Sequence, residues 1–179
     1  MTGRIESFCA ALDRINRLTG QAVRWLALAM VLVQFVIVVL RYAFGVSDIA
    51  LSESVLYMHA AIIMIGAGYT FLLDDHVRVD IFYGRASERG RDMIDLFGAA
   101  LFVIPSMLVL AWWTWPFVAS SWRILEGPLS VGGIPALFIL KSLIPAFCLL
   151  LAVQAVSFGL RAALRLGLLG GTHLGDRSQ

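Results

Sequence analysis

Five ionisable side chains lie close together in the stretch DDHVRVDIFY, between two apolar segments: Asp74, Asp75, His76, Arg78 and Asp80. Carboxylate oxygens and imidazole nitrogens are common protein ligands of Ca²⁺ and Zn²⁺. The spacing here matches no established ligand pattern, and Arg78 places a positive charge among the carboxylates. We therefore expect Arg78 to pair with Asp74 or Asp80, or the loop to be merely solvated, and we predict no metal site.

Three further ionisable side chains, those of Glu53, His59 and Lys141, interrupt segments that are otherwise apolar. Ionisable groups at membrane depth are costly and are often functional. Glu53 and Lys141 are expected near the same end of two helices, where they could form an ion pair. A proton or substrate site is the functional interpretation. A structural pair, or a lysine that extends to the headgroups, is the simpler interpretation.

His59 is the candidate for haem ligation. A haem held by two imidazoles needs a second histidine at matching depth, but His76 and His173 fall in a loop and in the tail. We therefore expect a structural histidine that bonds to a neighbouring helix. The two cysteines are far apart, and the chain has no nucleophile elbow, phosphate loop or zinc motif. The sequence predicts neither an enzyme nor a bound cofactor.

The elements that must position these residues are long apolar runs. The chain is 60% hydrophobic and 15% charged, with a mean hydropathy of +0.85, whereas soluble domains are about 45–50% apolar and about 25% charged. Uncharged runs of about 18 or more residues indicate transmembrane helices. The sequence predicts an all-α integral membrane protein with a four-span membrane domain over 21–164, its spans at about 21–43, 50–73, 93–120 and 134–161.

The segments outside this domain are polar or amphipathic. In residues 1–20, apolar side chains such as Ile5, Phe8 and Ile15 recur at helical spacing, with charged residues largely opposite. This pattern predicts an amphipathic helix that lies in the headgroup plane, with a helical extension of the first span as the alternative. Residues 165–179 are expected to form a flexible tail.

The arginines predict the orientation. Lys and Arg collect on the cytoplasmic side of bacterial inner-membrane proteins. The N-terminal segment, the loop after the second span and the tail hold most of them, whereas the other side has only Arg41, Arg123 and Lys141. Both termini and the DDHVRVDIFY loop are therefore predicted to be cytoplasmic, and the basic loop residues are expected to face anionic lipids.

The spans hold few polar groups, and the first has only Gln34 in its interior. A transporter that works alone should show broken helices and converging polar groups at midplane. This chain instead resembles the small, DctQ-like membrane subunit of tripartite ATP-independent periplasmic (TRAP) transporters. The resemblance covers most of the chain and depends on the four spans, the HVRVDIFY loop, Glu53 ahead of Tyr57, SWRILEG (121–127) and GGIPALFILKSLIP (132–145).

The resemblance implies a scaffold. Such a subunit anchors a large multi-span subunit, which carries the substrate and sodium sites, and a periplasmic binding protein delivers an organic acid. No nucleic-acid partner is implied. An autonomous small transporter or channel is the alternative, and a redox membrane anchor is a weaker one. The residues expected to be structural or to contact the partner are Glu53, Tyr57, His76, Arg78, Asp80, Arg123, Glu126 and Lys141.

Overall fold

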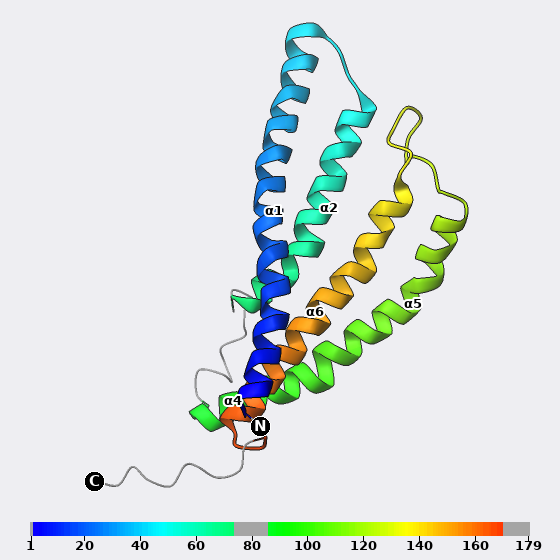
Figure 1. Ribbon diagram of the computed structural model, residues 1–179. Coiled ribbons are helices and arrows are strands. Elements are labelled where there is room, and N and C mark those ends of the chain that lie inside the picture. Colours follow the sequence, from blue (N-terminus) through cyan, green and yellow to red (C-terminus); the bar gives the residue numbers. More distant parts are fainter. Residues whose placement is uncertain (1, 74–85, 170–179) are drawn as a thin grey trace.

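The structure is a computed structural model that describes residues 2–73 and 86–169. The DDHVRVDIFY loop, with His76, Arg78 and Asp80, therefore lies outside the described residues, as does most of the tail. Every regular element in the described ranges is helical, as the apolar runs predict (Figure 1). The elements are α1 (Thr2–Phe44), α2 (Ile49–Leu72), α4 (Glu88–Phe97), the π-helical segment η1 (Gly98–Val103), α5 (Ile104–Arg123) and α6 (Leu137–Arg165).

Four helical stretches are long and apolar enough to cross a membrane. They are α1, α2, α6 and the continuous run from α4 through η1 to α5. The α1–α2 and α5–α6 connections lie at one end of the bundle, opposite the end where α1 begins and α6 finishes (Figure 1). In the first connection the Asp48 side chain caps α2 by accepting a hydrogen bond from the Leu51 backbone N–H at 2.8 Å.

The predicted amphipathic helix of residues 1–20 is not a separate element, because α1 continues without interruption to Phe44. At 1.5 Å per residue α1 is about 65 Å long, roughly twice the thickness of the hydrocarbon core. Its first half also packs differently from the predicted pattern. Phe8 and Ile15 are about half exposed, whereas Asp13 and Asn16 are buried. These two polar residues therefore face the protein, while Arg14 and Arg17 beside them stay exposed.

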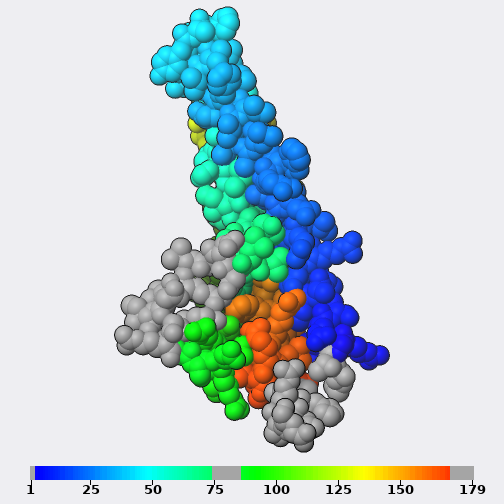
Figure 2. Space-filling view, turned by 90° about the vertical axis from the view of Figure 1, so that its left-hand side faces the viewer, coloured from blue at the N-terminus to red at the C-terminus, as the bar shows by residue number. Residues whose placement is uncertain are grey.

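The central helix of the bundle is α6, which contacts α1, α2, α4 and α5. Small side chains let its neighbours approach closely, as is usual between membrane helices. A Cβ placed on Gly159 of α6 would lie 3.4 Å from the Ala99 Cβ of η1. Figure 2 shows α1 and α2 side by side on one face of the molecule.

The π-helical segment η1 ends two residues before a proline. Pro105 has no backbone N–H to donate, and its ring crowds the carbonyl four residues earlier. The wider turns of a π-helix suit such a position, and the Ile104 N–H bonds to the Ala99 carbonyl, five residues earlier. The third membrane stretch thus stays continuous while it changes its helical geometry next to α6.

Candidate functional site

Glu53 holds the connection between α5 and α6. Its side chain is buried in the bundle, 6% exposed, where α2 faces residues 130–134. One carboxylate oxygen accepts the Ser130 N–H at 3.0 Å and the other accepts the Ile134 N–H at 2.8 Å. Gly133 makes this approach possible, since a Cβ there would lie 2.2 Å from a Glu53 oxygen. The partners of Glu53 are therefore backbone groups.

Lys141 bonds to Glu126 rather than to Glu53. Glu126 lies in the α5–α6 connection, three residues beyond the end of α5, and Lys141 is in the second turn of α6. The Lys141 Nζ also sits 3.9 Å from the centre of the Phe117 ring, a cation–π contact. Next to this pair the Trp122 indole N–H donates to the Ser142 hydroxyl at 2.8 Å. These contacts tie α5, its following loop and α6 together.

The pair between Glu126 and Lys141 predicts a response to acid. The hydrogen bond from Lys141 is the main cause that lowers the pKa of the Glu126 carboxyl from its ordinary 4.5. The unfolded chain then binds more protons, so this stabilisation is complete at neutral pH and is lost as the pH falls below about 4.5. Lys141→Met should remove this part of the acid sensitivity in thermal unfolding in detergent. An unchanged acid profile in that variant would contradict the assignment.

The remaining predicted residues differ in exposure. Tyr57 lies one turn after Glu53 and is half-buried, and its hydroxyl has no hydrogen-bond partner in the described part of the chain. Arg123 ends α5 and is exposed. His59 is exposed on the surface of α2, so the expected bond to a neighbouring helix is not seen within the described ranges. The structure therefore gathers Glu53, Glu126 and Lys141 around one connection.

A second polar cluster joins the first half of α1 to the end of α6. The two Asp13 oxygens accept hydrogen bonds from three α6 side chains: Oδ1 from Gln154 Nε2 at 3.1 Å and from Ser157 Oγ at 2.7 Å, and Oδ2 from Arg161. Asn16, which is fully buried, donates to the Gln154 oxygen at 2.8 Å. This polar cluster consists of Asp13, Asn16, Gln154, Ser157 and Arg161.

Sequence reasoning missed this cluster, although a signal was present. Asp13 and Asn16 are three residues apart, and Gln154, Ser157 and Arg161 are three and four apart. Such spacings place side chains on one face of a helix. In a chain this apolar, the polar side chains of two such helix faces need hydrogen-bond partners when they are buried. The predicted amphipathic pattern assigned Asp13 to the exposed face, and so hid the match.

The polar cluster requires a glycine on α2. A Cβ on Gly68 would lie 2.2 Å from the Asn16 Oδ1 and 3.1 Å from the Leu150 Cβ. Gly68→Ala should therefore push α2 from α1 and α6 and lower the free energy of unfolding by about 2 kcal/mol, as overpacking does. Gly66→Ala is the matched control, since its Cβ would meet only Val23 Cγ1, at an ordinary 3.6 Å. Equal thermal stability of both variants in detergent would contradict this packing.

The contacts described above join helices to one another. In the described ranges no three His, Cys, Asp or Glu side chains are grouped so that they could hold a metal ion. Near the end of α6, Arg165 bonds to Asp92 of α4 at 2.5 Å and lies 3.6 Å from Asp95. Together with the polar cluster and the Glu53 contacts, this link joins helices at both ends of the bundle.

A family model described as "Tripartite ATP-independent periplasmic transporters, DctQ component" matches residues 30–165. No match was found among the curated proteins or the solved structures. The matched range begins within α1 and ends at the last residue of α6, so it includes the Glu53 contacts, the Glu126–Lys141 pair and the α6 side of the polar cluster. The match, together with the four apolar helices, shows that this chain belongs to the DctQ family, the small membrane components of TRAP transporters.

Proposed function

We propose that this subunit is a rigid brace that anchors the large transport subunit in the membrane. The observation that carries the proposal is the use of its ionisable side chains inside the bundle. Glu53 is bound to two backbone N–H groups and Lys141 to Glu126. A group that moves a proton or a solute must exchange partners during transport, whereas these groups fix one helix to the next.

The proposal extends to the transport cycle. The family acts with a large membrane subunit and a periplasmic binding protein, and we propose that uptake is coupled to sodium and that the substrate is an organic acid. Sodium ions and substrate would then bind to the large subunit. The proposed location is the bacterial inner membrane, with both termini in the cytoplasm. The bias of Lys and Arg toward the termini supports this orientation.

For the loop from Asp74 to Tyr83, the role predicted from the sequence remains a proposal. Its charges are expected either to pair with one another or to contact the large subunit. Arg89 and Arg91, in the α4 that follows, add to the arginines on the same side of the bundle. This distribution supports a cytoplasmic face that meets anionic headgroups.

Co-expression with the large subunit tests the proposal. In mild detergent, a tag on this chain should purify both membrane subunits together. Proteoliposomes that hold both subunits and the binding protein should accumulate solute in a sodium gradient, and those without this chain should not. Accumulation driven by this chain alone would overturn the proposal, as would a stable lone monomer from cells that make both subunits.

A further inference from the structure

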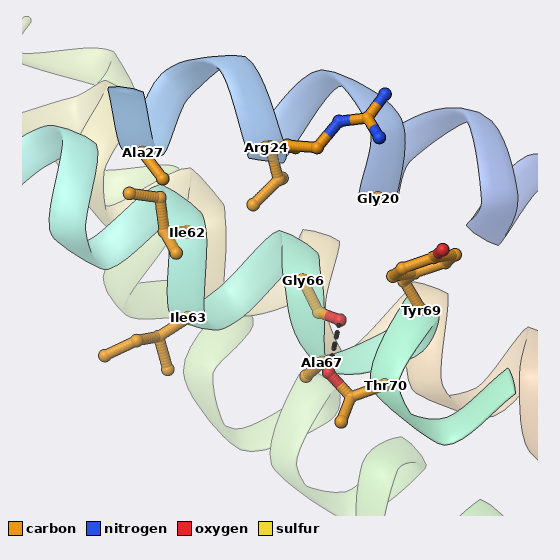
Figure 3. A pocket seen from close by; sticks show the side chains of 10 residues that line it. Gly20, Arg24, Ala27, Ile62, Ile63, Gly66, Ala67, Tyr69 and Thr70 are labelled. Atoms are coloured by element: carbon orange, nitrogen blue, oxygen red, sulfur yellow. Dashed lines mark hydrogen bonds between the residues drawn. The ribbon is translucent and has the colours of Figure 1, made fainter. Parts of the chain in front are cut away.

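A groove runs between α1 and α2 on the outer side of the bundle. It has a volume of about 530 Å³ and opens to the surroundings. Figure 3 shows Gly20 and Ala27 of α1 facing Ile62, Gly66 and Tyr69 of α2 across it. The Tyr69 ring lies against the Gly20 backbone: a Cβ added to Gly20 would lie only 2.2 Å from the ring carbon Cγ. The ring thus fills the space beside Gly20, whereas Ala27 and Gly66 leave room between the two helices.

Two rows of residues flank the groove and continue beyond it. On each helix they are spaced alternately by three and four residues, the spacing of a seam that receives another helix. On α2 the exposed part of the row ends at Ile63, which lines the groove. On α1 the exposed part beyond the groove begins after Ala27, at Val31. The rows are Ile49, Ser52, Leu56, His59, Ile63, Gly66 and Thr70 on α2, and Gly20, Arg24, Ala27, Val31, Gln34 and Val38 on α1.

Each row carries one polar side chain at the same depth. Gln34 and His59 are equally many residues from the α1–α2 connection, roughly 15 Å or half the thickness of the hydrocarbon core. Both are exposed, and neither bonds to any residue that the structure describes. A hydroxyl can bond to its own helix, as Thr70 does to the Gly66 carbonyl at 3.1 Å. An amide or an imidazole facing lipid is costly without a partner.

The chemistry of this face decides between possible occupants. An acyl chain would fill the groove but would leave the Gln34 amide and the His59 ring without hydrogen bonds. A transmembrane helix that carries donor and acceptor side chains at this depth satisfies both, and the small residues let it approach closely. We infer that one transmembrane helix of the large subunit docks on this face and bonds to Gln34 and His59. The inference rests on the proposed function and specifies the face of this subunit to which the large subunit binds.

Photo-crosslinking tests this placement directly in the co-expressed complex. A benzophenone amino acid is introduced at position 34 or 59, and the adduct is identified by mass spectrometry. Val36 is the matched control, because it has similar depth on α1 and is 46% exposed, but faces away from the groove. Leu108, 61% exposed on α5, is the second control. We expect adducts with the large subunit when the photoreactive residue is at position 34 or 59, and none when it is at position 36 or 108.

The outcomes separate this inference from the proposed function. Adducts with the large subunit at 36 or 108 alone would overturn the docking face and leave the proposed function intact. Adducts at 34 and 59 with a second copy of this chain, or with lipid alone, would overturn the docking face as well. If no large subunit purifies with the chain at all, the proposed function fails, and the inference fails with it.

A pair of substitutions adds a quantitative measure. Gln34→Leu combined with His59→Leu replaces the two polar side chains of this face with apolar ones. Because neither side chain bonds within the described part of this subunit, its fold should be unaffected. The affinity for the large subunit should fall about tenfold, the effect expected of two bonds between membrane helices. The affinity is measured as the fraction of large subunit retained at increasing detergent. Retention equal to that of Val36→Leu would overturn the role of the two side chains.

Discussion

Asp13→Ala should lower the free energy of unfolding by about 3 kcal/mol, the range expected when one partner of a buried charge pair is removed. The substitution removes the Asp13 acceptor from three donors of α6, those of Gln154, Ser157 and Arg161. Ser157 Oγ keeps only its longer contact of 3.4 Å with the Cys9 carbonyl. Ser157 and Gln154 are buried, so water does not replace the lost bonds. Arg161 is half exposed and contributes less. Thermal or denaturant unfolding in detergent measures the loss.

Two variants serve as controls for Asp13→Ala. Glu6→Ala removes an exposed carboxylate from the same helix and should change stability by no more than about 0.5 kcal/mol. Asp13→Asn retains one acceptor oxygen and the shape of the side chain, so its effect should lie between the two. If Asp13→Ala were as stable as Glu6→Ala, the polar cluster would not hold α1 to α6.

Glu53→Ala should loosen the α5–α6 connection and destabilise the protein by about 2–3 kcal/mol, because hydrogen bonds to a charged group contribute about 1.5–3 kcal/mol. The Ser130 and Ile134 N–H groups would lose their acceptors. Hydrogen–deuterium exchange should therefore rise most at these two amides, beyond any rise in the interior of α1. Exchange measured in detergent resolves the two regions.

Matched variants separate the Glu53 carboxylate from general packing. Gly133→Ala leaves the carboxylate in place but puts a methyl group where its oxygens lie, 2.2 Å from the nearest. It should raise exchange at the same two amides. Glu53→Gln keeps one acceptor and turns an N–H donor toward the other backbone N–H, so it should have an intermediate effect. Unchanged amide exchange in Glu53→Ala would rule out this contact.

The two sets of contacts act at different ends of the bundle. Glu53 of α2 holds the α5–α6 connection, whereas the polar cluster joins α1 to α6 near the opposite end. Each set links segments that are distant in the sequence, so each resists the separation of helices more than the unwinding of any one helix. The proposed role as a brace would depend on this kind of resistance, because helix contacts in lipid gain little from a hydrophobic drive.

The four apolar helices could be predicted from the amino-acid sequence, since crossing a membrane depends on local length and apolar character alone. The sequence also indicated the family, through the loop motif and the order of the spans. Glu53 and Lys141 stood out as residues of interest because a charge in an apolar run is visible without any partner. These properties are each read from one segment at a time.

Which polar groups bond to one another depends on how the helices pack. Glu53 bonds to backbone N–H groups 77 and 81 residues away, and backbone donors leave no mark in a sequence. Asp13 turns inward because Gln154, Ser157 and Arg161 offer it donors, which overrides the pattern that placed it outside. A buried polar group is stable only when its partner lies within hydrogen-bond distance. That distance is set by how α1, α2 and α6 pack, and no single segment contains it.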